Sequence, residues 1–240
     1  MRAVLIRPDW SKRTIMKVKI LRQQHPGAKP YWQTFEYEGD TGASIAAVLD
    51  SINYRDDIVD SDGNPTDRIS WECSCVQGMC GACAMVINSV PALACDTFVK
   101  DLKGSVITIE PLRKFPVISD LVVDRGIIQE NLRKINAFIG EYHKENEKDH
   151  ELEYQIGRCL KCGLCLEACP NYVKGDNFYG PLFANDSFFV MSRSKGDSKQ
   201  IKKDYGEHFA KGCSKSLACE KVCPVNIPTL ASIAKMNRGK

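Results

Sequence analysis

The stretch CLKCGLCLEACP, residues 159 to 170, spaces four cysteines by two, two and three residues and follows the last with a proline. Bacterial ferredoxins hold iron–sulfur clusters with this run, because soft thiolates on a tight loop bind iron well. A zinc ribbon is the alternative, but so closely spaced a set of cysteines overcrowds a tetrahedral site for a single ion. The stretch therefore predicts an iron–sulfur centre.

A second stretch downstream, CSKSLACEKVCP at residues 213 to 224, repeats this spacing with one exception, because Ser216 stands where the second cysteine is due. In ferredoxins with two clusters, the fourth cysteine of each run binds the cluster of the other run. This exchange assigns one [4Fe–4S] cluster to Cys159, Cys162, Cys165 and Cys223. It assigns a third cluster to Cys169, Cys213 and Cys219, with Ser216 at the vacant corner.

The serine decides which type of cluster the third site is expected to hold. A neutral hydroxyl is a poor ligand for iron that favours thiolates, so a cluster held by three cysteines can lose that iron. We therefore expect a [3Fe–4S] cluster beside Ser216. The alternative is a [4Fe–4S] cluster whose open iron carries water or the serine. Either arrangement changes the charge of the cluster, which is one of the determinants of its reduction potential.

Upstream, the segment CVQGMCGACAMVINSVPALAC spaces four cysteines by four, two and eleven residues: Cys75, Cys80, Cys83 and Cys95. This order is that of plant-type [2Fe–2S] ferredoxins. Gly78, Gly81 and Ala82 give the loop the freedom to bend and to point amide N–H groups at sulfur. A structural zinc site is the alternative, but it is usually built from pairs two residues apart. Cys73 is surplus, either as a core or near-cluster thiol or, alternatively, as an exchanged ligand.

Hydrophobic patterning around the cysteines predicts an α+β chain with two domains. β-Branched residues with partial alternation predict a strand at 15–22, a second strand is expected at 31–37, and short apolar runs predict further strands at 84–87 and 106–109. Helical spacing predicts a helix within 41–57, capped by Thr41 or Ser44. We expect residues 1–113 to form a β-grasp plant-type ferredoxin domain. Apolar positions from Ile127 to Ile139 predict a helix, and 143–153 reads as a solvated helix or linker. We expect residues 114–240 to form an all-helical bacterial-type ferredoxin domain.

Bulk properties exclude several classes of protein. The chain has 240 residues and a net charge of +3, without a basic cluster, so we expect no nucleic acid partner. No apolar run approaches the roughly 18 residues of a membrane span, and the first residues lack a secretory signal pattern. The 12 cysteines gather in three groups, which in a reducing compartment indicates metal ligands and not disulfides.

One plant-type cluster motif followed by two bacterial-type motifs resembles the iron–sulfur subunit of succinate dehydrogenase and fumarate reductase, the complex II family. The resemblance covers essentially the whole chain. It rests on CVQGMCGAC, PLRKFPVISDLVVD, CLKCGLCLEACP and CSKSLACEKVCP, and the last resembles the family in its missing cysteine. It implies a chain with three clusters and no substrate site of its own, working as a subunit of a quinone oxidoreductase.

The resemblance also implies partners and a location. A flavoprotein subunit with FAD is expected beside the [2Fe–2S] end, and membrane anchor subunits with quinone and sometimes haem beside the [3Fe–4S] end. The chain is then expected to relay single electrons while lying peripherally on the cytoplasmic face of the cell membrane, held there by the anchors.

Departures from the family pattern bear on the acceptor. Members that use ubiquinone have a tryptophan a few residues beyond Cys169 and a histidine directly after Cys213, where this chain has Lys174 and Ser214. A menaquinone-linked fumarate reductase or succinate dehydrogenase is therefore favoured. The alternative is the iron–sulfur subunit of a different flavoprotein reductase, which need not use a quinone. An enzyme of the dehydratase type, working at an open iron, would gain nothing from two further redox clusters.

Overall fold

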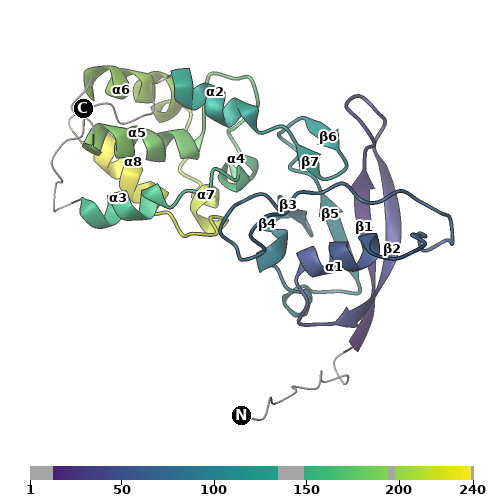
Figure 1. The fold of residues 1–240 in the computed structure, drawn as a ribbon. Coiled ribbons are helices and arrows are strands. Elements are labelled where there is room, and N and C mark those ends of the chain that lie inside the picture. Colours follow the sequence, from purple (N-terminus) through teal and green to yellow (C-terminus); the bar gives the residue numbers. More distant parts are fainter. Residues whose placement is uncertain (1–12, 135–148, 194–197, 239–240) are drawn as a thin grey trace, which may run out of the picture.

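The computed structural model of the chain describes residues 13–134, 149–193 and 198–238. Figure 1 shows a sheet-containing part, formed by the first half of the chain, beside a helical part formed by the second half. The loop that carries Gly81 meets the loop that carries Cys162 where the two parts touch. This arrangement follows the expected order of an α+β chain, with strands first and helices second.

The first part is built on a five-stranded sheet in the order β2-β1-β5-β3-β4. Its elements are β1 (Arg13–Arg22), β2 (Tyr31–Asp40), α1 (Ile45–Asn53), β3 (Ala84–Ile87), β4 (Val90–Leu93) and β5 (Val106–Glu110). β1 pairs with β5 in parallel, and the other neighbours pair antiparallel. The four strands expected from the sequence are present, and β4, which contains Pro91, was not predicted.

Helix α1 forms where the sequence predicts it. Ser44 is its N-cap, and the hydroxyl of Ser44 accepts a hydrogen bond from the Ala47 N–H at 3.2 Å. The residues at helical spacing, Ile45, Val48, Leu49 and Ile52, are fully buried. They share one core with Val18, Ile20, Phe35, Ile107 and Ile109 of the sheet. Burial of these side chains holds the scaffold behind the first cysteine loop.

A short hairpin connects the two parts. It consists of β6 (Val117–Ser119) and β7 (Val122–Val123), with Asp120 in the left-handed region at a φ of 46° between them. The segment from residue 114, expected to be all-helical, therefore begins with a hairpin, and helices follow from Gly126. Strands of three and two residues are too short for alternation to reveal them.

The second part consists of short helices around one longer helix, α5. The elements are α2 (Gly126–Lys134), α3 (His150–Gly157), α4 (Leu164–Ala168), α5 (Pro181–Arg193), α6 (Ser198–Tyr205), the π-helical turn η4 (Gly206–Ala210), α7 (Ala218–Lys221) and α8 (Thr229–Asn237). Phe183 and Phe188 of α5 are buried in a second core with Tyr205, Phe209 and Met236. Residues 135–139 of the predicted helix lie outside the described residues. Within the described part, no helix is long and apolar enough to cross a bilayer.

Candidate iron–sulfur centres

The first cysteine loop has backbone N–H groups pointed at sulfur. The amides of Gln77 and Met79 donate to Cys75 Sγ at 3.4 and 3.3 Å, and the Gly78 amide donates to Cys95 Sγ at 3.2 Å. The loop turns inward through positive φ angles at Val76 (53°) and Gly78 (71°). A chain bent in this way encloses sulfur with amide donors, which is the surrounding that a thiolate-bound cluster needs.

All four cysteines of the first set come together in this loop. Cys95 arrives from the 3₁₀ turn η2 (Ala94–Asp96), and its Sγ lies 3.3 Å from Cys83 Sγ. Cys75 accepts hydrogen bonds from the Cys80 side chain and amide as well as from Gln77 and Met79. The Gln77 and Met79 amides lower the pKa of Cys75 to about 7, whereas burial raises the pKa of Cys83 to about 12. Cys75 is thus readily a thiolate, while Cys83 needs a bound cation to become one.

A second cavity, in the helical part, is lined by cysteines from both runs. Cys159, Cys162 and Cys165 of the first run face Cys223 of the second run across it, and Cys219 also reaches its wall. The remaining lining is largely apolar, with Leu160, Leu164, Leu182 and Ile227. The Ile227 amide donates to Cys223 Sγ at 3.4 Å. Four soft donors in an apolar enclosure suit an iron–sulfur cluster.

A third cavity lies next to the second and shares Cys219 with it. It is lined by Cys169 of the first run, by Cys213 and Cys219 of the second run, and by Ser216. Phe178, Phe209 and Ile233 supply much of its apolar wall. The Ser216 side chain is exposed, and its hydroxyl accepts a long 3.5 Å contact from the Ala218 amide. The donor set here is three thiols and one neutral hydroxyl.

The loops that carry the two runs have the same backbone conformation. Lys161 and Lys215, each two residues after the first cysteine of its run, have φ angles of 53° and 57°. Gly163 and Leu217 are left-handed as well, and they are the N-caps of α4 and α7. The two short helices pack against each other. The repeat in cysteine spacing is therefore also a repeat in structure.

Burial favours the neutral form of Cys159, Cys162, Cys165 and Cys219 in the helical part. It raises the pKa of both Cys162 and Cys219 to about 11 and raises that of Cys165 well above its usual value. Iron binds thiolates, so the positive charge of iron must offset the cost of burying negative sulfur. The thiol donors and the apolar linings of the second and third cavities fit iron–sulfur clusters, as do the amide donors around the sulfurs of the first loop.

Cys73 lies in the first loop but apart from the core. It is exposed, and its pKa is raised by partial desolvation and by the nearby Asp50, Cys80 and Cys95. The hollow beside it is lined by Cys80, Arg125 and Lys161 among others. The prediction that Cys73 is a core thiol is therefore wrong. The alternative considered with it, a thiol close to the first cysteine site, agrees with its position beside Cys80.

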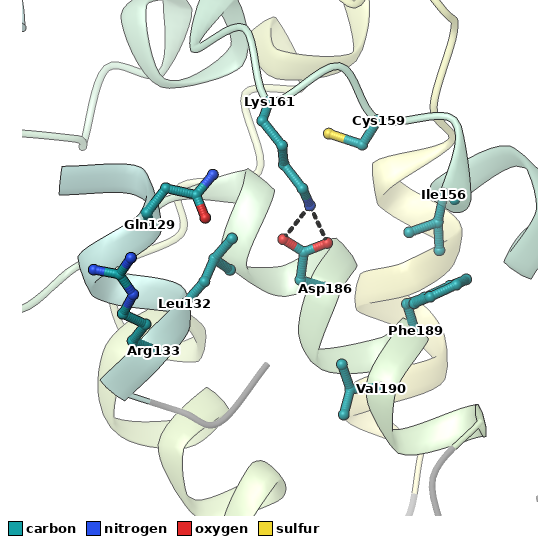
Figure 2. A pocket seen from close by; sticks show the side chains of 10 residues that line it. Gln129, Leu132, Arg133, Ile156, Cys159, Lys161, Asp186, Phe189 and Val190 are labelled. Atoms are coloured by element: carbon teal, nitrogen blue, oxygen red, sulfur yellow. Dashed lines mark hydrogen bonds and ion pairs between the residues drawn. The ribbon is translucent and has the colours of Figure 1, made fainter. Parts of the chain in front are cut away.

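Two charged groups beside the sites were not recognised from the sequence. Figure 2 shows the Lys161 ammonium next to Cys159, pointing at the buried carboxylate of Asp186 on α5; both carboxylate oxygens lie 2.5 Å from it. Burial raises the pKa of Asp186, and the lysine opposes that effect. Arg125 contacts backbone carbonyls of both parts. Lys161 could have been noticed in the sequence, because a lysine also stands two residues after the first cysteine of the other run, at Lys215. Nothing in the sequence links Arg125 to the cysteines.

Comparisons with known proteins agree with this architecture. A family model for the 2Fe-2S iron–sulfur cluster binding domain matches residues 17–130, and a model for the 4Fe-4S dicluster domain matches residues 155–227. The first match extends beyond the boundary expected near residue 113 and includes the hairpin.

Curated relatives match over nearly the whole chain. The chain is 31% identical to the succinate dehydrogenase iron–sulfur subunit of Bacillus subtilis, over 95% of this chain and 93% of that one. It is also 31% identical to the fumarate reductase iron–sulfur subunit of Wolinella succinogenes, over 88% and 90% of the two chains. A chain of the Sdh1 complex of Mycobacterium smegmatis shares the fold, with a TM-score of 0.73 at 22% identity, covering 93% of this chain and 96% of that one.

Proposed function

Because this chain belongs to the family of iron–sulfur subunits of succinate dehydrogenase and fumarate reductase, we propose that it relays single electrons between a flavoprotein subunit and a quinone site in membrane anchor subunits. The flavoprotein carries FAD and the succinate or fumarate site, and the anchors carry the quinone and in some complexes haem. The chain lies peripherally at the membrane and holds no substrate of its own.

We assign three clusters to the eleven cysteines that line the sites. A [2Fe–2S] cluster takes Cys75, Cys80, Cys83 and Cys95; a [4Fe–4S] cluster takes Cys159, Cys162, Cys165 and Cys223; a [3Fe–4S] cluster takes Cys169, Cys213 and Cys219 and leaves its corner at Ser216. When bound, each cluster accepts and releases one electron at a time. The chain fixes the sulfurs, donates amide hydrogen bonds to them and excludes water.

The observation that carries this proposal is that each of the two cavities in the helical part is lined by cysteines of both runs. Cys223 faces the cysteines of the first run, and Cys169 faces those of the second run. A single cluster or a set of zinc sites would not require the runs to cross in this way. With this assignment, the chain consists of a β-grasp ferredoxin domain followed by a mainly helical ferredoxin domain with two clusters.

We place the flavoprotein at the tip of the first cysteine loop. Val76 and Met79 are 51% and 69% exposed there, next to the amides that donate to Cys75. Large apolar side chains this exposed beside a redox site favour a protein partner that covers them. An electron would then enter or leave through the first cysteine loop.

We place the quinone end beside the third cavity. The Ser214 hydroxyl, which stands where ubiquinone-linked members have histidine, donates to Asn171 Oδ1 at 2.6 Å, and Leu230 in the cavity wall is 46% exposed. Because Ser214 is engaged with Asn171 and Lys174 replaces the tryptophan, we favour menaquinone over ubiquinone. The alternative remains a different flavoprotein reductase, whose electrons would pass through the same three clusters.

The test is spectroscopy on the complex purified with its partner subunits. Electron paramagnetic resonance should give a [3Fe–4S] signal in the oxidised complex and a [2Fe–2S] signal after dithionite reduction. Iron analysis should give about nine irons per chain, the sum for the three cluster types. A colourless preparation with zinc and little iron would refute the assignment.

Assays of the same preparation separate the two candidate functions. The succinate or fumarate hypothesis requires FAD in the large subunit and turnover of one of these acids coupled to a menaquinone analogue. Spectra as predicted, together with a large subunit that acts on another substrate, would instead support the different flavoprotein reductase.

A further inference from the structure

The loop that carries Cys80 and Cys83 touches the loop that carries Cys159 and Cys162. The contact is at Gly81, which has a φ of 77°. A Cβ atom added at Gly81 would lie 2.7 Å from Cys162 Cβ and 3.2 Å from Leu160 Cβ. Since real Cβ atoms do not approach each other so closely, the glycine is what allows the first and second cysteine loops to meet.

The side chain of Arg125 spans this contact. It extends from the segment between β7 and α2. Its Nη1 donates to the carbonyl oxygen of Gly81 at 2.9 Å and to that of Cys162 at 3.4 Å, and its Nη2 donates to the carbonyl of Ala82 at 3.3 Å. One guanidinium thus binds backbone of both loops, which a side chain with a single donor atom cannot do with the same geometry.

A carboxylate anchors the outer edge of the same guanidinium. Glu72 Oε2 accepts from Arg125 Nη2 at 2.6 Å, and the two side chains are 46% and 20% exposed. The more buried end of the guanidinium faces the carbonyls, where hydrogen bonds are less screened by water. The positive charge is close enough to Cys162 to lower its pKa, although burial is the larger influence and raises it.

We propose that Arg125 is a positioning residue that clamps the [2Fe–2S] loop to the [4Fe–4S] loop and places a permanent positive charge between the two centres. This inference rests on the proposed function, because it assumes that the first two cysteine sets hold clusters. The clamp fixes the gap that an electron must cross between them. The charge favours the reduced, more negative form of each cluster, because local charge is one of the determinants of cluster potential.

The decisive variants are Arg125→Met and Arg125→Lys in the purified complex. Redox titrations followed by electron paramagnetic resonance give the potential of each centre, and the broadening of the [2Fe–2S] signal by the reduced [4Fe–4S] centre reports their separation. In Arg125→Met we expect both potentials to fall and the broadening to weaken. In Arg125→Lys the charge remains, so we expect potentials close to wild type but weakened broadening, because one ammonium does not span the three carbonyls.

Arg113→Met is the matched control, because it removes a guanidinium whose two hydrogen bonds go to the carboxylate of Glu110 and leaves every contact of Arg125 in place. Its broadening should equal that of the wild type. If Arg125→Met does not assemble, the lysine variant alone decides, and wild-type broadening in it refutes the clamp. Wild-type potentials in an assembled Arg125→Met complex would refute the role of the charge. Absence of both cluster signals from the wild-type complex would instead count against the proposed function.

Discussion

Ser216 is the single residue on which the type of the third cluster depends. It lines the cavity with Cys169, Cys213 and Cys219. Its neighbours Lys215 and Leu217 have positive φ angles, as have the residues at the same positions of the complete run. The backbone around it is therefore shaped like one that presents a cysteine. What is missing is the sulfur and not the loop.

Replacing Ser216 with cysteine should convert the third centre from [3Fe–4S] to [4Fe–4S]. A thiolate at this corner would hold the fourth iron, and the added negative ligand should lower the reduction potential. The oxidised complex should then lose its [3Fe–4S] resonance. Ser214→Cys is the control, because it adds a thiol to the same loop at a residue bound to Asn171. An unchanged oxidised spectrum in Ser216→Cys would contradict the ligand assignment.

Cys73 and Cys75 differ sharply although they are two residues apart. Cys75 accepts two amide hydrogen bonds from Gln77 and Met79, whereas Cys73 is exposed beside the loop. Cys75→Ser should therefore remove or strongly alter the [2Fe–2S] signal of the reduced complex. Cys73→Ser should keep the signal and the iron content of the wild type. Loss of the signal in Cys73→Ser would show that Cys73 is an exchanged ligand.

At the scale of elements, a buried ion pair ties the hairpin to the sheet. Arg22 at the end of β1 and Asp120 between β6 and β7 are 2% and 3% exposed, and Arg22 Nε lies 2.9 Å from Asp120 Oδ1. Asp120 also accepts from the amides of Gln23 and Ser70, and Arg22 donates to the carbonyls of Asp67 and Arg68. This network holds the linker, and with it Arg125, against the first domain.

Asp120→Asn should destabilise the first domain by about 3–5 kcal/mol, the usual effect of removing one partner of a buried pair. Asparagine tolerates the left-handed φ at this position. The loss of stability would therefore come from the missing charge of the ion pair and not from backbone strain. Urea unfolding followed by tryptophan fluorescence measures it as a lower midpoint at constant slope. Glu110→Gln breaks a surface pair with the 48% exposed Arg113 and should cost no more than about 1 kcal/mol. Equal midpoints for the two variants would contradict the prediction.

At the scale of the whole molecule, the two parts depend differently on their clusters. The sheet and α1 share a core of fully buried side chains that does not need metal, such as Val18, Ile20 and Leu49. By contrast, α4 and α7 have five and four residues, and each begins inside a cysteine loop. Helices this short are not stable alone, so metal binding must supply part of their folding free energy.

Removal of iron should therefore unfold the surroundings of α4 and α7 before the sheet. Hydrogen exchange followed by mass spectrometry on the chelator-treated chain should show fast exchange across 159–169 and 213–223, with protection retained in β1 and β5. Reconstitution with iron and sulfide should restore the protection. Simultaneous loss of protection in both parts would mean that the clusters hold the entire chain together.

Much of this architecture follows from local sequence. Alternation in β1, β2 and β5 and the apolar stripe of α1 can be read from a few neighbouring residues, because each of these elements has one face on a core and the other toward solvent. β3 is buried on both faces and is predicted instead as a short apolar run. Cysteine spacing likewise predicts the cluster type, because most of the ligands of each cluster must come from one tight loop. Helix α5 was not delimited in advance, since other helices pack around it and its polar residues Asn185, Asp186 and Ser187 are buried together with its apolar ones, so no amphipathic pattern marks it.

The order of the three cluster motifs, and the vacant position at Ser216, were determined by the sequence alone, because they depend on residue type and spacing within single loops. Only the tertiary structure decided the contact of Gly81 with Cys162, the clamp by Arg125 and the ion pair of Lys161 with Asp186. The residues in these contacts are far apart in the sequence: Lys161 and Asp186 are separated by 25 positions, and Gly81 and Cys162 by 81. No local pattern records such a pairing, because it exists only once both parts have folded and packed together.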